Sequence, residues 1–227
     1  NHFNNASSIM HNYMLFAEVE EIIKKYNLPI EKSPSGGYHL FFRTKNPGTN
    51  KKLARKLNPK NRPETLIETR GEGGYVIVAP SRDYVMKKGS LTEIPVIDPI
   101  EREILLAAAI TFNEYIDDRD YANTSRQDFS NDERPGDEYN KSHEAIDESK
   151  SILTEKGWTT KTGTYWTRPD KSARKGISAT FGKVAPNVFY VFSSNAYPFE
   201  QDKAYLPFQI LAILKYNSDF EKAASEL

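Results

Sequence analysis

A histidine, a carboxylate and an arginine stand beside glycine-rich segments at two places in this sequence. The first place is Ser35-Gly36-Gly37-Tyr38-His39-Leu40-Phe41-Phe42, and the second is Ile67-Glu68-Thr69-Arg70-Gly71-Glu72-Gly73-Gly74-Tyr75. Arginine can contact phosphate with two N–H groups at once, a carboxylate binds hard divalent cations, and glycine lets a ligand approach the backbone closely. These residue types therefore indicate a site for an anionic ligand together with a divalent cation.

Both segments have the pattern of β-strands that end or begin at glycine-rich turns. Because side chains alternate between the two faces of a strand, His39 lies on the face opposite Tyr38 and Leu40. In the second segment Glu68 and Arg70 share one face. If the two strands are neighbours in one sheet, the histidine, the glutamate and the arginine converge on the same ligand.

Composition limits the classes of protein to which the chain can belong. Its 227 residues are enough for two modest domains, and lysine plus arginine equals aspartate plus glutamate at 31 each, so a nucleic-acid partner would have to meet a local basic patch. Cysteine is absent, which excludes disulfides, thiolate zinc sites and cysteine nucleophiles. Without a membrane-length apolar run or a signal-peptide pattern, we expect a soluble, cytoplasmic protein with no membrane partner.

The expected elements place a first domain over residues 1–116. Apolar residues at helical spacing predict helices over 15–26 and 100–115. After the histidine strand, two more strands are predicted over 65–70 and 75–79.

Residues 117–140 have few aliphatic side chains and many Asp, Asn, Ser and Arg, which is typical of a linker. Residues 141–227 then predict a small α+β domain with a polar helix near 142–155, short strands and a C-terminal helical pair. The Asn217-Ser218-Asp219 segment is a suitable cap for the last helix. The aromatic residues of the short strands are either core side chains, which their spacing favours, or platforms on which bases stack: Trp158, Tyr165, Trp166, Phe189, Tyr190 and Phe192.

A basic run between residues 51 and 62 is the local patch with the charge to hold a nucleic-acid backbone. Within it, Lys52, Arg55 and Lys56 are the candidate DNA-binding residues. The alternative interpretation is the solvated face of a helix. The run consists of Lys51, Lys52, Arg55, Lys56, Lys60 and Arg62.

The ordered motifs resemble the primase-polymerase domain of phage and plasmid replication proteins, in the archaeo-eukaryotic primase superfamily. The resemblance rests on residues 35–40 and on residues 67–75 continued by Ala79-Pro80-Ser81. It implies a partial, RRM-like α+β catalytic domain with a mixed or antiparallel sheet, followed by a small α+β accessory domain. Further segments resemble the region that follows this domain in phage-type primases: Arg134-Pro135-Gly136-Asp137, Trp158, Tyr165-Trp166-Thr167-Arg168-Pro169, Ser178-Ala179-Thr180, Val191-Phe192-Ser193-Ser194 and residues 217–224.

The resemblance also implies an activity, template-directed nucleotidyl transfer by a DNA primase/polymerase with Mg²⁺ or Mn²⁺. The implied partners are nucleoside triphosphates, a single-stranded DNA template and a helicase module in the same polypeptide. The small-x-His motif of the family falls on Gly37-Tyr38-His39, which assigns the phosphates of the nucleotide to His39, with Ser35 and Gly37 beside it. The third carboxylate of the family falls on Glu68, the expected metal ligand, where relatives usually carry aspartate. Arg70 matches a phosphate-contacting arginine, and His39, Glu68 and Arg70 are the expected catalytic residues.

These assignments compete with simpler structural interpretations. Glu68 can form a strand-end ion pair with Arg70, and such exposed pairs add little stability. Gly71, Gly73 and Gly74 can serve a turn between two strands instead of contacting a nucleotide.

The first motif of the family, an Asp-x-Asp pair, is absent before His39, where the first acidic residue is Glu18. We expect the pair to lie immediately upstream of Asn1, which makes this chain an N-terminally truncated piece. Because two-metal catalysis needs several carboxylates, we expect the chain by itself not to synthesise or extend primers. The alternative function is a non-catalytic nucleic-acid-binding or helicase-loading adaptor that retains the primase fold.

Overall fold

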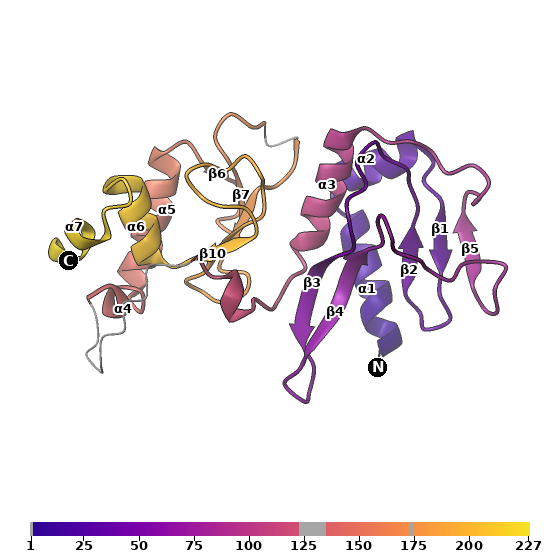
Figure 1. The fold of residues 1–227 in the computed structure, drawn as a ribbon, viewed down its shortest axis with the longest axis horizontal. Helices are drawn as coiled ribbons and strands as arrows, with labels where there is room; N and C mark the ends of the chain where they lie inside the picture. The colour runs from indigo at the N-terminus through magenta and orange to yellow at the C-terminus, as the bar shows by residue number, and fades with distance from the viewer. Residues whose placement is uncertain (1, 123–134, 173–174) are drawn as a thin grey trace. The chain divides into compact units, whose positions relative to one another are not determined.

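The computed structural model describes residues 2–122, 135–172 and 175–227. Its backbone contacts divide the chain into two compact units, one of Asn1–Asn113 with Arg174–Gly176 and the other of Glu114–Ala173 with Ile177–Leu227 (Figure 1). Both units combine helices with antiparallel sheets, which confirms the predicted α+β class. The predicted domain limits stay predictions, and residues 123–134 of the predicted linker, with Arg134 of the second-part motifs, lie outside the described residues.

Three helices belong to the first unit: α1 (His2–Met14), α2 (Ala17–Lys25) and α3 (Pro99–Ile110). The helices predicted over 15–26 and 100–115 are thus confirmed as α2 and α3, while α1 was not predicted. α3 contacts both α2 and the hairpin described below. The apolar side of α2 enters the core through Val19, Ile22 and Ile23.

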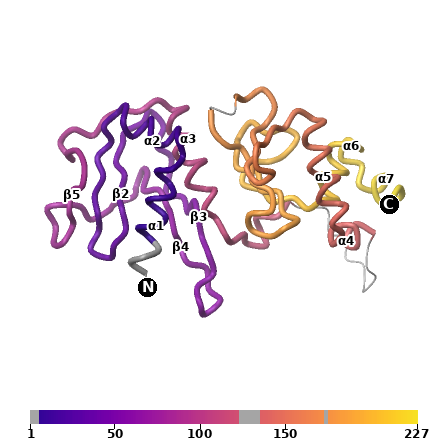
Figure 2. The backbone as a smooth tube through the Cα atoms, turned by 180° about the vertical axis from the view of Figure 1, so that it is seen from behind, coloured from indigo at the N-terminus to yellow at the C-terminus, as the bar shows by residue number. Residues whose placement is uncertain are grey.

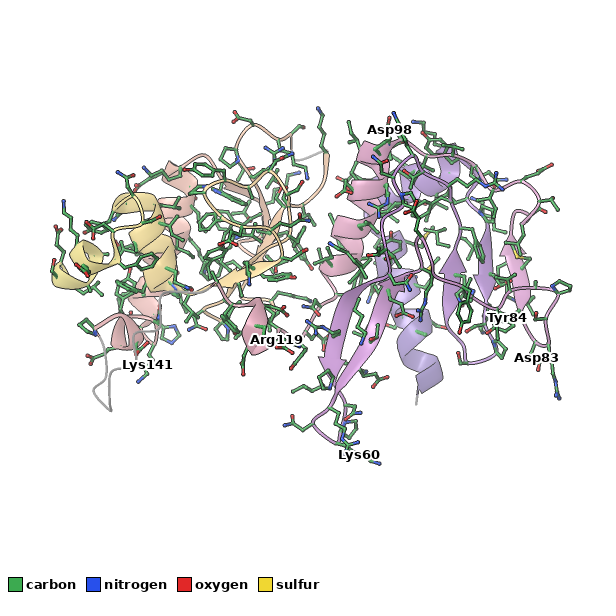
Figure 3. All side chains as sticks on the ribbon, viewed as in Figure 1. Lys60, Asp83, Tyr84, Asp98, Arg119 and Lys141 are labelled. Atoms are coloured by element: carbon green, nitrogen blue, oxygen red, sulfur yellow. The ribbon has the colours of Figure 1, made fainter. Side chains whose placement is uncertain are left out.

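The N-terminus of α3 is capped. The Asp98 side chain, labelled in Figure 3, accepts a hydrogen bond of 2.7 Å from the backbone N–H of Ile100. Pro99 occupies the first helical position, where the missing N–H of proline does no harm. The helix therefore starts at a defined residue directly after the chain leaves the core at Ile97.

A three-stranded antiparallel sheet carries the histidine. Its strands are β1 (Ile30–Lys32), β2 (Tyr38–Leu40) and β5 (Val85–Lys88), in the order β2-β1-β5. β1 and β2 form a hairpin in which Glu31 lies directly opposite His39. Tyr38, Leu40 and Phe42 pack against the core that contains α2, which confirms that the histidine faces the other way.

A second, two-stranded sheet is formed by β3 (Lys51–Leu57) and β4 (Pro63–Thr69). The loop between these strands extends beyond the rest of the first unit in Figures 1 and 2, and Lys60 lies in this loop (Figure 3). β4 confirms the strand predicted over 65–70. The helix-face alternative for the basic run is wrong, because the run lies on β3 and the hairpin loop.

The strand predicted over 75–79 is wrong. No strand is assigned to these described residues, and Tyr75, Val76 and Ile77 are exposed. At the end of the segment, the backbone N–H of Ala79 donates to a side chain, the Oε2 atom of Glu31, instead of a neighbouring strand. The apolar run therefore continues as an irregular connection toward β5.

The second unit places helices around a five-stranded antiparallel sheet of order β10-β9-β8-β7-β6. The predicted polar helix is confirmed as α5, and the predicted C-terminal pair as α6 and α7. Asp219 caps α7 as expected, since its side chain accepts a hydrogen bond from the Lys222 N–H at 2.9 Å. The elements are η1 (Asp118–Asp120), α4 (Pro135–Tyr139), α5 (His143–Glu155), β6 (Thr159–Thr160), β7 (Tyr165–Thr167), β8 (Ala179–Phe181), β9 (Phe189–Val191), β10 (Lys203–Tyr205), α6 (Pro207–Lys215) and α7 (Phe220–Ser225).

Aromatic side chains form the centre of this second unit. Trp158 packs edge-on against Phe189 with ring centroids 5.2 Å apart, and Phe189 in turn contacts Phe199. Trp158, Trp166, Phe189 and Phe192 are buried, so the core interpretation is confirmed for these four, whereas Tyr165 and Tyr190 are half-buried. Among the described helices of either unit, none is long and apolar enough to cross a membrane.

Candidate functional site

His39 is held in a defined orientation from three sides. Its Nδ1 atom lies 2.9 Å from Oε1 of Glu31, the residue opposite it in the β1–β2 hairpin. The ring meets Phe41 edge-on and lies at 30° to the ring of Tyr84, each with centroids 5.9 Å apart. Tyr84, labelled in Figure 3, directly precedes β5. With 26 % of its side chain exposed, His39 is packed but open to a ligand.

Glu31 has a fully buried carboxylate with both oxygens hydrogen-bonded. Oε1 meets His39, and Oε2 accepts a hydrogen bond of 2.6 Å from the backbone N–H of Ala79. Sequence reasoning missed this residue. Its place opposite residue 39 becomes evident only when the two strands are paired as a hairpin with the five-residue loop Ser33–Gly37.

The turn before His39 explains the serine and glycines of the first motif. The Ser33 N–H donates to the Gly37 carbonyl at 2.9 Å, and the Gly36 N–H donates to the Ser33 carbonyl at 3.0 Å. Gly36 has a φ of 87°, a conformation that glycine adopts without steric strain. Ser35 is exposed at this turn, and a Cβ on Gly37 would come within 3.1 Å of the Ser33 hydroxyl. Ser35 and Gly37, two of the four predicted nucleotide-binding residues, therefore lie in the turn that leads into the histidine strand.

Glu68 and Arg70 form an ion pair at the exposed end of β4. A guanidinium nitrogen of Arg70 donates to Oε1 of Glu68, and the side chains are 46 % and 36 % exposed respectively. Lys52 of β3 is the residue opposite Glu68 in the hairpin. The structural alternative of a strand-end ion pair is therefore realised in this structure.

The glycine run after Arg70 packs against the chain itself. The Gly71 N–H donates to the Asn50 side chain at 3.0 Å, and the Glu72 N–H donates to the Gly48 carbonyl at 2.7 Å. A Cβ on Gly71 would lie 2.1 Å from that carbonyl oxygen, so only glycine fits there. The close backbone approach at Gly71 is made by the protein's own backbone, which favours the turn interpretation.

The two motifs do not lie on neighbouring strands. His39 belongs to the β2-β1-β5 sheet, whereas Glu68 belongs to the separate β3-β4 sheet, so the hypothesis of one shared sheet is wrong. Glu31 links the two regions. Its Oε1 atom is hydrogen-bonded to His39, and its Oε2 atom accepts from the backbone N–H of Ala79, at the end of the segment that follows Arg70.

The candidate DNA-binding residues all lie on β3. Lys52 is exposed, while Arg55 and Lys56 are half-buried. The backbone N–H of Arg55 donates to the Asn113 side chain at 2.7 Å, which ties the strand to the end of the first unit. Lys60 and Arg62 extend the positive charge into the exposed hairpin loop.

The described residues do not gather the ligands of a preformed divalent-metal site. Within residues 2–122, 135–172 and 175–227, no group of three or more histidine, aspartate and glutamate side chains is close enough to hold a metal. Mg²⁺ requires near-octahedral oxygen ligation, and the groups around Glu68 are the cationic Arg70 and Lys52. Glu68 as a ligand for Mg²⁺ or Mn²⁺ therefore stays a prediction, with no cluster of further acidic or histidine ligands beside it among the described residues.

Comparison with known proteins identifies the domain around this site. Residues 13–97 match the family described as bifunctional DNA primase/polymerase, N-terminal. No curated protein and no solved structure matched the chain. The match contains both glycine-flanked motifs, Glu31 and the whole β3–β4 hairpin, and it ends before α3. Over residues 13–97 the chain is therefore similar to the bifunctional DNA primase/polymerase N-terminal family.

Proposed function

We propose that the first unit binds nucleoside triphosphates and single-stranded DNA as part of a DNA primase/polymerase in a phage or plasmid replication protein. The observation that supports this most is the histidine at the small-x-His position. Its Nδ1 atom is hydrogen-bonded to the buried carboxylate of Glu31, and its Nε2 atom has no hydrogen-bond partner among the described residues. A packed, partly exposed ring with one nitrogen left for a ligand is suited to binding a phosphate oxygen.

Arg70 and Ser35 supply the remaining phosphate contacts in this proposal. The guanidinium of Arg70 uses one nitrogen on Glu68 and keeps further N–H groups for a phosphate. The Ser35 hydroxyl sits in the exposed turn that leads into the histidine strand. The described residues bind and orient the triphosphate, and no nucleotidyl-transfer step is assigned to them.

The β3–β4 hairpin is the proposed contact for the template strand. Within the described part of the chain, Lys52 and Lys56 have no ion-pair partner, so their charges are available to phosphates. Phosphate contacts account for most of the affinity of proteins for single-stranded nucleic acid when sequence is not read. An exposed basic hairpin is compatible with that role.

A binding test separates the nucleotide role of His39 from the DNA role of the hairpin. For His39→Ala we expect the affinity for a fluorescent nucleoside triphosphate to fall about tenfold, roughly the loss of one charge-assisted hydrogen bond. The affinity for single-stranded DNA should stay the same in fluorescence anisotropy. His143→Ala, at an exposed histidine of the second unit, is the matched control. A variant that weakens DNA binding more than nucleotide binding would contradict the role assigned to His39.

One observation supports a second candidate function, a non-catalytic nucleic-acid-binding or helicase-loading module. It is the lack of an acidic cluster among the described residues. Primer-extension assays with Mg²⁺ and with Mn²⁺ distinguish the candidates. Sustained nucleotide incorporation by residues 1–227 would exclude the non-catalytic module, whereas binding without incorporation is expected of both candidates, because the Asp-x-Asp pair is absent before His39.

A further inference from the structure

We propose that Glu31 is a positioning residue that fixes the hydrogen of His39 on Nδ1 and thereby presents Nε2 to the triphosphate. This inference rests on the proposed function of His39. It concerns a residue outside both glycine-flanked motifs, and its basis is the pair of hydrogen bonds made by one buried carboxylate.

The geometry leaves Glu31 little freedom. The turn of residues 33–37 sets the register of the β1–β2 hairpin, and this register places Glu31 directly opposite His39. The carboxylate has no exposed surface, and its second oxygen is bonded to the Ala79 N–H at 2.6 Å. The side chain therefore cannot turn away from the imidazole without leaving this N–H without a partner.

Burial of the carboxylate is itself informative. A buried charge is tolerated when hydrogen bonds satisfy it, and an apolar side chain of similar size is often at least as good for stability alone. Glu31 spends one oxygen on His39 and the other on the segment that follows Arg70. A carboxylate at this point thus ties the histidine strand to the backbone of the segment that follows Arg70, which an apolar residue would not do.

The hydrogen-bond chemistry gives the pair a direction. A carboxylate only accepts hydrogen bonds, so the Nδ1 atom that faces it carries hydrogen. A phosphate oxygen also only accepts, so the neutral ring takes up a proton from solvent on Nε2 when phosphate binds. The bound ring then donates through Nδ1 to Glu31 and through Nε2 to the phosphate. A partner behind the functional histidine commonly fixes the tautomer and orientation of the ring in this way.

Glu31→Gln should reverse this arrangement without changing the size of the side chain. The carboxamide has one oxygen and one NH₂ group, and the Ala79 N–H requires the oxygen. The NH₂ group then faces Nδ1 of His39, which must accept, so the hydrogen of the neutral ring moves to Nε2. The substitution therefore predicts an inverted tautomer, an effect that loss of packing alone would not produce.

The tautomer can be read from long-range ¹H–¹⁵N NMR spectra of the chain with labelled histidine. The sequence contains four histidines, and the spectrum of His39→Ala identifies the signals of His39. We expect hydrogen on Nδ1 in the unsubstituted protein and on Nε2 in Glu31→Gln. Glu20→Gln removes the same charge from the exposed pair with Lys24 on α2, and it should leave the His39 signals unchanged.

The outcomes separate this inference from the proposed function. An Nε2–H tautomer in the unsubstituted protein, which needs no folded variant to observe, would overturn the positioning role, as would an unchanged His39 pattern in Glu31→Gln.

In binding assays Glu31→Gln should lower triphosphate affinity by about fivefold, since a neutral donor replaces a charged one. If His39→Ala leaves nucleotide affinity intact, the proposed function of His39 is wrong whatever tautomer is found. If His39→Ala weakens binding and Glu31→Gln inverts the tautomer but binds as before, the positioning role is wrong.

Discussion

Two of the predicted phosphate-binding residues, His39 and Arg70, each pair with a carboxylate, and the two pairs are built in opposite ways. Glu31 and His39 face each other across a hairpin, with the carboxylate fully buried. Glu68 and Arg70 are two residues apart at the end of one strand, and both are substantially exposed. The first pair is fixed by tertiary structure, whereas the second can exchange its partner for another ion or ligand.

The difference follows from solvation. A buried charge loses its hydration and becomes strongly dependent on the groups that replace it, so removal of one partner is destabilising. An exposed pair remains hydrated and is screened by salt, so it adds little to stability. By this reasoning, one pair organises the domain and the other is available for binding.

The sharpest test of the comparison is Glu31→Ala. It leaves Nδ1 of His39 and the Ala79 N–H without their acceptor in a buried site, so we expect a loss of about 3 kcal/mol in unfolding free energy. Hydrogen exchange of the β1 and β2 amides measures this loss locally. Glu20→Ala on α2 is the control and should change exchange very little. A loss below about 1 kcal/mol for Glu31→Ala would remove the distinction between the two pairs.

The histidine could be placed from sequence, while its partner could not. The face on which His39 lies was predictable, because the alternation of side chains between the two faces of a strand depends only on neighbouring residues, here residues 38–42. Glu31 required the register of a hairpin whose first strand is three residues long and gives almost no periodic signal. The glutamate was therefore invisible until the two strands were paired.

The hairpin and the segment after it show the same limit. β3 consists largely of charged residues, and its register shifts twice between Lys52 and Arg55, so an alternating pattern is absent. The apolar residues at 75–77 have the composition of a strand, but pairing is a tertiary property, and they lie exposed in an irregular connection. Amphipathic helices such as α2 were predictable because helical periodicity is local.

A second test asks whether the basic residues of β3, near the exposed Glu68–Arg70 pair, bind single-stranded DNA. Replacement of Lys52, Arg55 and Lys56 by glutamine removes three positive charges from β3. We expect weaker binding of single-stranded DNA and a salt dependence, log K against log salt, that is shallower by about 2, or roughly 0.7 for each lost phosphate contact. Glutamine at the exposed Lys156, Lys161 and Lys222 of the second unit is the matched control. If both triple variants give the same slope as the unsubstituted chain, the hairpin does not hold the template.

The smallest effect on unfolding free energy is expected from Glu68→Gln, because the Glu68–Arg70 pair is exposed whereas the Glu31 carboxylate is buried. Removal of an exposed carboxylate should change the unfolding free energy by no more than about 0.5 kcal/mol. It also releases the Arg70 nitrogen that Glu68 now accepts from, and it removes a negative charge beside a proposed phosphate contact. In buffer containing EDTA, triphosphate affinity should therefore rise by about twofold, because like-charge repulsion is lost in a solvated site. Nucleotide titrations of Glu68→Gln and of the unsubstituted chain in the same buffer measure this. A fall in affinity without metal would mean that Glu68 holds Arg70 in its binding position, and the exposed pair would then be as fixed as the buried one.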